Sequence, residues 1–357
     1  MKKTIYIVAS IILCIATLIL CILYPYWNPS HLTDEPIAEE NKGLTLHFID
    51  VGQGDCTLIE SKGHYALVDA GEYKERDKVI SYLSLLGVRT LDFIIATHPH
   101  SDHIGGLSDV IRHFNPSTLI MPNVESDSWN YVLDAADERG VICETPEPFD
   151  TYQIGSATLT VLSPASDEVY SDLNNYSVVT MIEYGDTSFL LTGDAEALVE
   201  KTLVKSGFDL SADVLKCGHH GSSSSSSDAF LDAVKPQAAI ISCGKNNDYG
   251  HPHKEVISAL DDRDIPVWRT DLLGSIKATT DGEKIYISTN DTTTEVNQIP
   301  TEAQSETAPY IGNRNSKVFH LNTCSGIKDM QDKNKVEFLN REDAEKAGYK
   351  PCASCKP

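Results

Sequence analysis

The sequence predicts an α/β protein with a layered sandwich architecture, and three observations carry that prediction. Short β-type runs alternate with helical patterns from residue 44 onward, without a regular strand–helix–strand repeat. The run LDFIIAT (91–97) is almost continuously apolar, as in a strand that is covered on both faces. The composition also changes at both ends of this region, which separates it from an apolar N-terminal segment and a polar C-terminal part.

Residues 1–24 are predicted to form a transmembrane anchor. Lys2 and Lys3 precede an uncharged apolar run, Ile5 to Leu23, that is about long enough to cross a bilayer. Acidic residues follow this run, which places the N-terminus inside the cell and the bulk of the chain outside. A cleaved signal peptide, which would release a secreted protein, is the alternative. The next residues, YPYWNP, lack a small-x-small cleavage site and favour the uncleaved anchor. Residues 25–43 read as a tether.

Residues 44–290 are predicted to form the main domain, which is long enough to bury a sizeable core. It opens with three short β-type runs between glycine turns, LTLHFIDV, CTLIE and YALVDAG. Helical periodicity predicts helices at 74–87, 103–114, 128–140, 195–206 and 253–262. Strand-like runs recur at 157–162, 177–184, 187–192, 212–216, 237–242 and 283–288. The six serines at 222–227 read as a flexible polar loop.

The overall charge limits the partners that the chain can recruit. With a formal net charge of −23 the 357-residue chain repels polyanions at long range, so nucleic acid would need a local site, such as bound metal ions. The nine cysteines form no disulfide pattern, and those of the main domain read as lone buried thiols.

The segment ATHPHSDHIGGL (96–107) is the strongest functional signal. It places His98, His100, Asp102 and His103 within six positions, at the end of the apolar strand. Clustered imidazoles and a carboxylate are costly unless a cation compensates, and this donor set suits zinc, manganese or iron. Alternation along the segment lets His98 and His100 face one ion, while Asp102 and His103 face a second ion.

Further candidate ligands follow other apolar strands. Asp194, in LLTGD, could bridge two ions, although a helix N-cap is a fair rival reading. The motif VLKCGHHGS places His219 and His220 after a strand, and one of them should complete the second ion's ligands. His251, in YGHPH, has either a role in the site or a place in a surface loop.

These motifs together resemble a known family. FIDVGQGDCTLIE, LVDAG, THPHSDHIGG, NNYSVVTMIEYGDTSFLLTGD, DVLKCGHHGS and YGHP occur in that order and resemble the metallo-β-lactamase fold, more narrowly the nuclease-type domain of the ComEC competence proteins. The resemblance covers about residues 44–290. It implies an αββα sandwich with a dinuclear site at one edge. It also implies that the first metal is held by His98 and His100, the second by Asp102, His103 and His219, and both by a bridging Asp194.

One departure from the wider superfamily bears on the metal. The segment SDLNNYSVV, where many members supply a third histidine to the first metal, contains none here, and we expect Asn175 to lie beside the ligands instead. A more open first site would favour a harder ion such as manganese over zinc, and phosphodiester oxygen is a matching hard ligand. Asp69, in LVDAG, is expected to orient a ligand histidine. Asp55, in VGQGD, lines the site or belongs to a plain turn.

The same reading assigns catalytic roles. Two divalent ions lower the pKa of a water between them, and that water would attack phosphorus. Asp102 could orient the water or take its proton, and His220 or His251 could protonate the leaving oxygen.

Beyond the main domain the composition changes twice. Residues 291–313 hold no lysine or arginine and few apolar residues, so they are predicted to be a disordered linker. The tail 314–357 spaces His320 and Cys324 four apart and ends in a C-x-x-C pair, Cys352 and Cys355, which matches a structural tetrahedral zinc site. This part resembles the Ada-type metal-binding module.

The leading hypothesis is a membrane-anchored, extracellular, dinuclear metal hydrolase that cleaves phosphodiesters, with DNA as the favoured substrate. A phosphoesterase acting on cell-wall or lipid headgroups such as phosphorylcholine is the second reading, and the acidic composition favours this smaller substrate. A non-catalytic surface binding module is the third, and the intact ligand set speaks against it. The oligomeric state has no signature in the sequence.

Overall fold

The computed structural model describes residues 43–289, 292–296, 310–321, 324–327, 330–331, 334–338 and 341–355. The predicted anchor over 1–24 and nearly all of the tether over 25–43 lie outside these residues. Among the described residues, no helix has the length and apolar character needed to cross a membrane. The description concerns the unit Gly43–Pro357.

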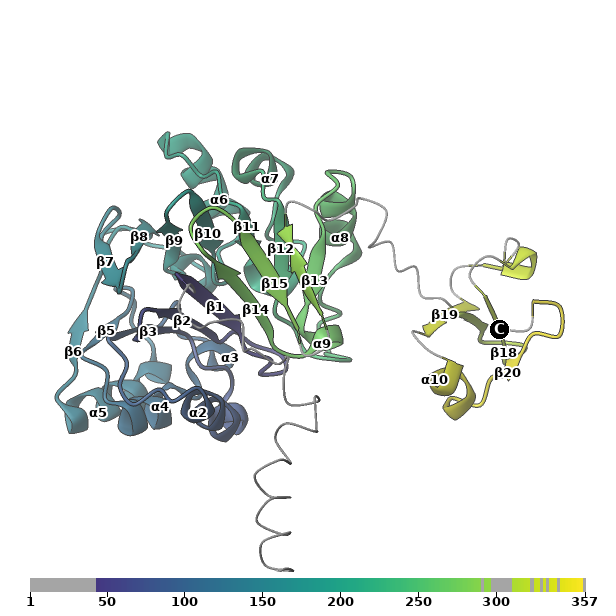
Figure 1. Cartoon of the computed structure of the whole chain (residues 1–357), viewed down its shortest axis with the longest axis horizontal. Coiled ribbons are helices and arrows are strands. Elements are labelled where there is room, and N and C mark those ends of the chain that lie inside the picture. Colours follow the sequence, from purple (N-terminus) through teal and green to yellow (C-terminus); the bar gives the residue numbers. More distant parts are fainter. Residues whose placement is uncertain are drawn as a thin grey trace, which may run out of the picture. The chain divides into compact units, whose positions relative to one another are not determined.

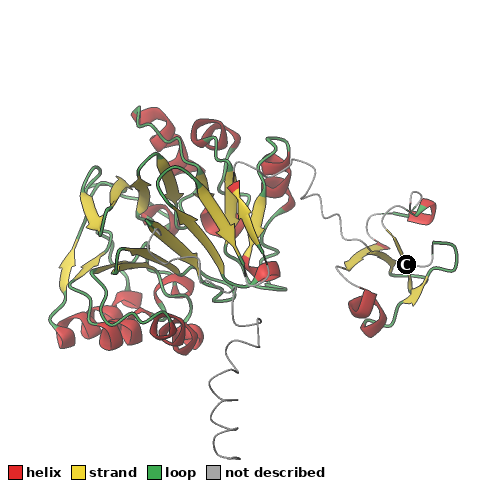
Figure 2. Ribbon diagram, viewed as in Figure 1, coloured by secondary structure: helices red, strands yellow, loops and turns green. Residues whose placement is uncertain are grey.

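Two sheets form the centre of the main domain (Figures 1 and 2). The first has nine strands among the described residues, in the order β16 (Thr293–Glu295), β15 (Ile285–Ser288), β14 (Ile276–Thr280), β1 (Leu44–Phe48), β2 (Thr57–Ser61), β3 (His64–Val68), β4 (Phe93–Ile95), β5 (Thr118–Ile120) and β6 (Ile142–Glu144). The second has seven, in the order β13 (Val267–Arg269), β12 (Ala238–Ile241), β11 (Val214–Lys216), β10 (Thr187–Leu191), β9 (Val179–Tyr184), β8 (Ala157–Ser163) and β7 (Thr151–Ile154).

Helices cover the outer face of each sheet, which gives four layers. Figure 1 shows α2 (Arg76–Leu85), α4 (Leu107–Phe114) and α5 (Asn130–Arg139) along the first sheet, and α6 (Ala197–Ser206), α7 (Asp228–Val234) and α8 (Lys254–Asp261) along the second. Three apolar clusters fill the spaces between the layers, one between the sheets and one under each set of helices. The predicted layered α/β sandwich is therefore confirmed.

Helix ends follow simple backbone chemistry. The residue after α4, Asn115, and the residues after α5 and α6, Gly140 and Gly207, adopt left-handed backbone angles, which glycine and asparagine tolerate best. α4 buries Val110, Ile111 and Phe114 along one side, as the periodicity of the segment predicts. Four of the five helices predicted from periodicity form within a few residues of their expected bounds. The fifth, predicted at 103–114, is divided into α3 (Ser101–Ile104) and α4 by Gly105 and Gly106.

Pairing direction determines which loops meet. Strands β3 to β6 run parallel to one another, and so do β10 to β13. Parallel strands present their carboxyl ends at one edge of a sheet, so the loops after β4, β10, β11 and β12 collect at the edges where ligands bind in open α/β sheets.

The structure changes the predicted domain limits on the C-terminal side. β16 lies inside the range 291–313 that was predicted as a disordered linker, and it pairs with β15 of the main domain. β17 (Tyr310–Asn313) also starts inside that range and belongs to the tail. The apolar content of 291–313 is low, but strand pairing needs only backbone hydrogen bonds, which composition does not reveal.

The tail forms a small sheet of its own. Its described strands lie in the order β19 (Lys335–Phe338), β17, β18 (Val318–Leu321) and β20 (Lys350–Pro351), with α10 (Arg341–Lys346) beside them. Phe319, Ala344 and Tyr349 form its buried cluster. This cluster is a small core for a folded module, which leaves room for a metal ion to contribute stability.

Candidate metal centre

The predicted ligands come from loops of both sheets. His98 follows β4 in the first sheet, whereas Asp194 and His220 follow β10 and β11 in the second. They meet because Asp194 Oδ2 lies 3.8 Å from His98 Nε2 and 3.5 Å from His220 Nε2. Gly193 allows the turn: its φ is +51°, and a side chain there would crowd Ser177 and Thr97.

His98 and His100 turn their nitrogen atoms toward one point. His98 Nε2 lies 3.0 Å from His100 Nδ1. The Thr97 hydroxyl donates to Asp69, so its oxygen is free to accept from His98 Nδ1–H at 3.1 Å. That tautomer leaves the Nε2 lone pair facing His100. Burial, followed by the neighbouring charge of His103, holds the pKa of His98 well below its usual value. The ring is therefore neutral, and its Nε2 lone pair can bind a metal ion.

His103 lies between two carboxylates. Its Nδ1 is 2.7 Å from Asp69 Oδ2, and its Nε2 is 3.2 Å from Asp194 Oδ1. Burial alone would lower the pKa of His103, but the charges of Asp194 and Asp69 outweigh it and hold the pKa well above its usual value. Thr97 donates its N–H and its hydroxyl to Asp69. Asp69 thus occupies the position predicted for a group that orients a histidine.

His220 is the more deeply buried of the adjacent histidine pair. Its Nδ1 lies 3.0 Å from the Ser242 carbonyl oxygen, and its Nε2 lies 3.2 Å from Asp102 Oδ2. Burial would lower the pKa of His220, but the charge of Asp194 and contacts with Asp102 and Asp55 raise it to about 10. Since Nδ1 is committed to a carbonyl, Nε2 is the atom that faces the site.

His219 lies at the rim. Its Nε2 is 3.8 Å from Asp194 Oδ2, and its Nδ1 is 3.0 Å from Ser224 Oγ and 3.6 Å from Glu196 Oε1. Both His219 and His220 have left-handed backbone angles, with φ of +51° and +55°. Non-glycine residues adopt this region at a cost, and two in succession indicate a turn constrained by its surroundings.

Asp102 lies in the first turn of the short helix α3 (Ser101–Ile104) and keeps part of its side chain exposed. Burial would raise its pKa, but the hydrogen bond to His220 and the charge of His103 lower it far below the usual range, so Asp102 is ionised. Its carbonyl oxygen accepts the N–H of Asp55 at 3.1 Å. A side chain on Gly54 would collide with that same carbonyl oxygen, so glycine permits the VGQGD loop to approach.

Asn175 does not face the histidines. Its side-chain amide donates to Glu196 Oε2 at 3.2 Å, and its oxygen accepts the Glu196 N–H at 3.2 Å. Glu196 in turn approaches His219. The residue in place of the absent histidine is therefore committed to Glu196.

His251 lies beside both members of the pair, with ring centroids 5.6 Å from His219 and 6.1 Å from His220. The Gly244 N–H donates to Gln53 Oε1, which orients the amide so that its NH₂ group faces His251 Nδ1 at 3.4 Å. The ring proton then resides on Nε2. Burial and the charges of His220 and His219 lower the pKa of His251 to about 4, so the ring is neutral at pH 7.

The structure adds two features that the sequence reading missed. Lys216 is buried at the end of β11, with its Nζ 2.6 Å from Asp55 Oδ2. The sequence feature that could have indicated this buried lysine is its position inside an apolar strand, directly before GHHG.

The serine segment 222–227, predicted to be a flexible loop, is instead ordered: the N–H groups of Ser226 and Ser227 donate to the buried carboxylate of Glu200. That prediction is corrected because an acceptor from α6 fixes the loop.

Two buried polar atoms that make no hydrogen bond among the described residues test whether this site fits a metal ion. His103 Nε2 and Asp194 Oδ1 face each other at 3.2 Å, are fully buried, and find no hydrogen bond within the described part of the chain. Ligand atoms of Asp55, His103, Asp194 and His220 all lie within 4.8 Å of one another. Buried polar atoms normally have partners, and a cation accepts lone pairs from imidazole and carboxylate alike. The residues therefore fit a divalent metal.

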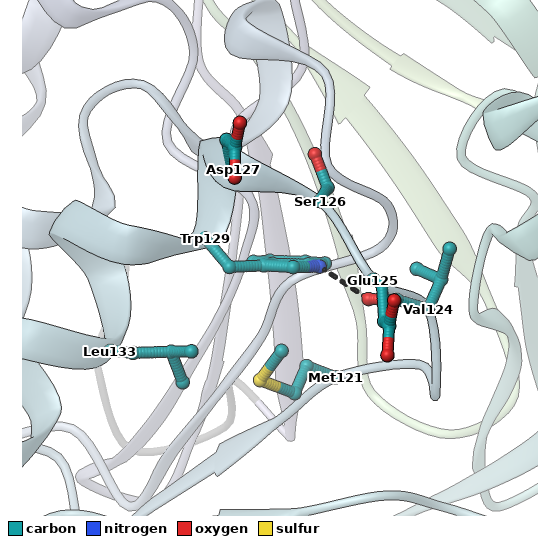
Figure 3. Close-up of a pocket in the computed structure, with 7 residues that line it drawn as sticks. All are labelled: Met121, Val124, Glu125, Ser126, Asp127, Trp129 and Leu133. Atoms are coloured by element: carbon teal, nitrogen blue, oxygen red, sulfur yellow. Dashed lines mark hydrogen bonds between the residues drawn. The ribbon is translucent and has the colours of Figure 1, made fainter.

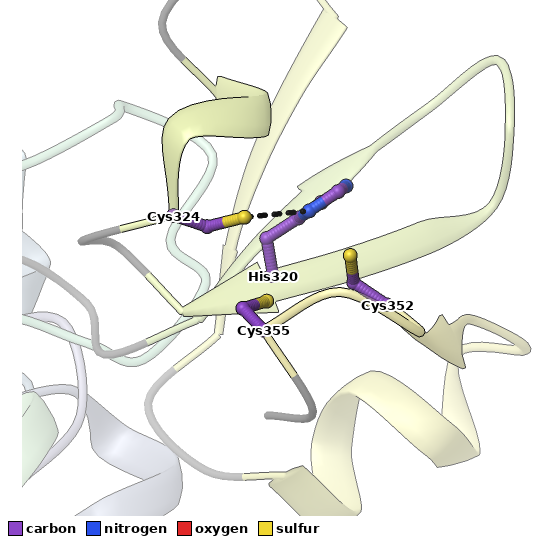
Figure 4. Close-up of side chains that lie close together, drawn as sticks. All are labelled: His320, Cys324, Cys352 and Cys355. Carbon is purple, nitrogen blue, oxygen red and sulfur yellow. Dashed lines mark hydrogen bonds between the residues drawn. The ribbon is translucent and has the colours of Figure 1, made fainter.

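The tail holds a second cluster. Figure 4 shows His320, Cys324, Cys352 and Cys355 turned toward one another, and their ligand atoms lie within 4.8 Å of each other. Cys324 Sγ is 3.4 Å from His320 Nδ1. The structure thus brings together the four residues whose spacing in the sequence predicted a zinc site.

An open depression lies on the segment after β5. Figure 3 shows Trp129, whose indole N–H donates to the Val124 carbonyl oxygen at 3.0 Å, with Met121 and Leu133 below the ring, Glu125 beside it and Asp127 above it. No residue predicted for the metal centre lines this depression.

The comparison with known families agrees with the fold and the site. The Metallo-beta-lactamase superfamily matches residues 49–245, more than half of the chain. The protein therefore belongs to this superfamily and has the fold of a metallohydrolase.

Its relatives narrow the class. ComE operon protein 3 of Bacillus subtilis is 36% identical over 253 residues, which are 65% of this chain and 32% of that protein. Recombination protein 2 of Haemophilus influenzae is 32% identical over 64% of this chain and 28% of that protein. Competence protein ComA of Neisseria gonorrhoeae is 30% identical over 68% and 33%. The resemblance to competence proteins is confirmed, and the chain spans about a third of the length of these relatives.

Proposed function

We propose that the protein is a dinuclear metal-dependent phosphodiesterase, with DNA as its favoured substrate. The pair of buried, unsatisfied atoms at His103 Nε2 and Asp194 Oδ1 is the observation that carries the metal centre. The relatives named for competence and recombination support a nucleic-acid substrate. Manganese or zinc suits the donor set.

The geometry supports a specific ligand assignment. His98 and His100 would hold the first ion, since their nitrogen atoms converge at 3.0 Å. Asp102, His103 and His220 would hold the second, and Asp194 would bridge, since its two oxygens face different histidines. Of the two adjacent histidines, burial favours His220 as the ligand and leaves His219 at the rim.

When bound, two such ions supply an activated water and neutralise charge on a phosphodiester. Asp102 is ionised and partly exposed, so it can orient that water or accept its proton. His220 is committed as a ligand in this assignment. The role at the leaving oxygen then falls to His251, which is neutral and carries its proton on Nε2, so it acts as a hydrogen-bond donor.

A second candidate is a phosphoesterase for small headgroups such as phosphorylcholine. The net charge of −23 favours it, because a long polyanion is repelled by such a surface, whereas a zwitterionic headgroup is not. A non-catalytic binding module remains the least supported reading, since it leaves the convergent ligand set without a purpose.

The remaining proposals concern placement and the tail. We expect the apolar run Ile5–Leu23 to anchor the protein in the membrane with the catalytic unit outside, or to direct secretion if it is cleaved. The cluster of His320 with three cysteines would hold one structural zinc ion, which would supplement the small apolar core of the tail.

The test uses the compact unit Gly43–Pro357, loaded with Mn²⁺ or Zn²⁺. It is incubated with single-stranded DNA, double-stranded DNA and bis-p-nitrophenyl phosphate, with Asp102→Ala and Asp194→Ala as paired variants. Cleavage of DNA and of the diester that both variants abolish supports a nuclease. Diester cleavage with intact DNA points to the headgroup reading, and no turnover with metal bound rejects phosphodiesterase activity.

A further inference from the structure

Lys216 is a buried cation next to the metal centre that no step of the proposed reaction uses. Its side chain is 2% exposed, at the end of β11 and directly before the turn that carries His219 and His220. An ammonium group in such a place is strongly unfavourable without an anionic partner. Asp55 is that partner, with Oδ2 at 2.6 Å from Nζ, and Nζ also donates to the Cys217 carbonyl oxygen at 2.9 Å.

The second oxygen of Asp55 faces His220. Oδ1 lies 3.3 Å from His220 Nδ1, on the side of the ring opposite the nitrogen that faces Asp102 and Asp194. The Nδ1–H of His220 donates to the Ser242 carbonyl oxygen at 3.0 Å, and in the described structure Asp55 Oδ1 makes no hydrogen bond, so the carboxylate acts on the imidazole through its nearby negative charge. Lysine, carboxylate and imidazole therefore form a continuous chain that ends at the metal centre.

A parallel chain ends at His103. There the Asp69 carboxylate contacts the imidazole Nδ1 at 2.7 Å and is itself held by the N–H and hydroxyl of Thr97. Among the described residues no hydroxyl donates to the Asp55 carboxylate, which is held instead by Lys216. Lys216 therefore holds the Asp55 carboxylate as Thr97 holds the Asp69 carboxylate.

We propose that Lys216 is a positioning residue of the metal centre: its ammonium group holds the Asp55 carboxylate against His220 and thereby strengthens His220 Nε2 as a ligand. The Ser242 carbonyl oxygen fixes the ring, and the carboxylate charge beside the same N–H raises the basicity of the ligating nitrogen; loss of such a partner typically lowers metal affinity 10–100-fold. The proposal rests on the metal centre of the proposed function, and it does not depend on which substrate is cleaved.

The test is a double-mutant cycle on the full chain. Lys216→Met, Asp55→Asn and the double variant are titrated with Mn²⁺ against a fluorescent chelator, because thiolate sites such as the tail cluster prefer zinc. Each single substitution should weaken Mn²⁺ binding about 10–100-fold. The double variant should be no weaker than the weaker single variant, because Lys216 acts through Asp55. Lys277→Met, an exposed lysine on β14, should bind as the unsubstituted protein does.

Two results overturn the proposal. The losses of Lys216→Met and Asp55→Asn could multiply in the double variant, which would mean that Lys216 acts independently of Asp55. Alternatively, Lys216→Met could bind Mn²⁺ with unchanged affinity. If Lys216→Met does not fold, comparing Asp55→Asn with the double variant decides, since the double variant leaves no unpaired buried charge; a further loss there refutes the proposal.

The Mn²⁺ titrations and the cleavage assay together distinguish failure of the positioning role from failure of the proposed function. Mn²⁺ binding that follows the cycle, without turnover of DNA or diester, leaves the positioning role standing and rejects the phosphodiesterase. Turnover with multiplying losses rejects the positioning role alone. Absence of Mn²⁺ binding by the unsubstituted protein overturns both.

Discussion

Metal binding at the main site should release protons, because carboxylates hold protons on two of the proposed ligands. The pKa of His220 is raised to about 10, and that of His103 lies well above its usual value. At pH 8 the His220 ring of the metal-free protein is therefore cationic, and the raised pKa of His103 acts in the same direction. A metal ion needs the lone pair that the proton occupies, so binding at this pH should displace at least one proton per molecule.

The magnitude follows from the proton count. Each displaced proton changes the apparent metal affinity about tenfold per pH unit, so the affinity should rise by at least about tenfold per pH unit below the pKa of His220. Titration calorimetry in buffers of different ionisation enthalpy measures the proton number directly. His220→Gln should reduce it by about one. His251→Gln is the matched control, because the pKa of His251 is lowered to about 4 and its ring carries no releasable proton at pH 8.

The sign for stability follows from the same values. The pKa of His220 rises from 6.5 to about 10 on folding, so protonation stabilises the metal-free protein fully below pH 6.5. This contribution disappears as pH rises toward 10, and the melting temperature of the metal-free protein should fall over that window. Release of less than one proton at pH 8, or a proton number that His220→Gln does not change, would refute the reasoning.

Three further predictions test individual contacts. Asp69→Asn removes the carboxylate that holds His103 and should weaken Mn²⁺ binding about 10–100-fold in chelator competition, with unchanged zinc content of the tail. Cys352→Ser removes one of four tail ligands, so zinc should be lost and the amide resonances of the tail should collapse, while those of the main domain stay in place. Glu200→Ala leaves the buried N–H groups of Ser226 and Ser227 unpaired and should cost about 1–3 kcal/mol in urea unfolding; an unchanged midpoint would show that the serine segment does not need this acceptor.

Prediction from sequence worked best where the signal was local. β12 is a continuous apolar run and β10 ends in one, and both strands were predicted within two residues. β6 was missed because all three of its residues are exposed, so it has neither an apolar run nor alternation. α7 was missed because only seven residues separate the serine segment from the next loop. Short elements take their conformation from neighbours that are distant in sequence.

The residues of the metal centre likewise fall into those that a local sequence pattern predicted and those that it did not. The histidines of THPHSDH lie within one loop, so their spacing alone indicated a site. The choice between His219 and His220 could not be made from sequence, since it depends on which ring the turn directs inward. The pairing of Lys216 with Asp55 joins the second sheet to the first, and neither residue carries a local sign of the other.

Backbone strain around the metal centre explains why the frame must be rigid. Asp69, His219 and His220 all have left-handed backbone angles, each at a cost of order 1–3 kcal/mol for a non-glycine residue. Glycine would relieve that cost but would remove the side chains that the site uses. The surrounding sheets impose these angles: His219 N–H bonds the Gly193 carbonyl oxygen, and Asp69 N–H bonds that of Ile95. Backbone hydrogen bonds and three buried apolar clusters thus sustain a turn geometry that directs imidazoles and carboxylates to one point, where the lone pairs that face one another are satisfied by protons or by a metal ion.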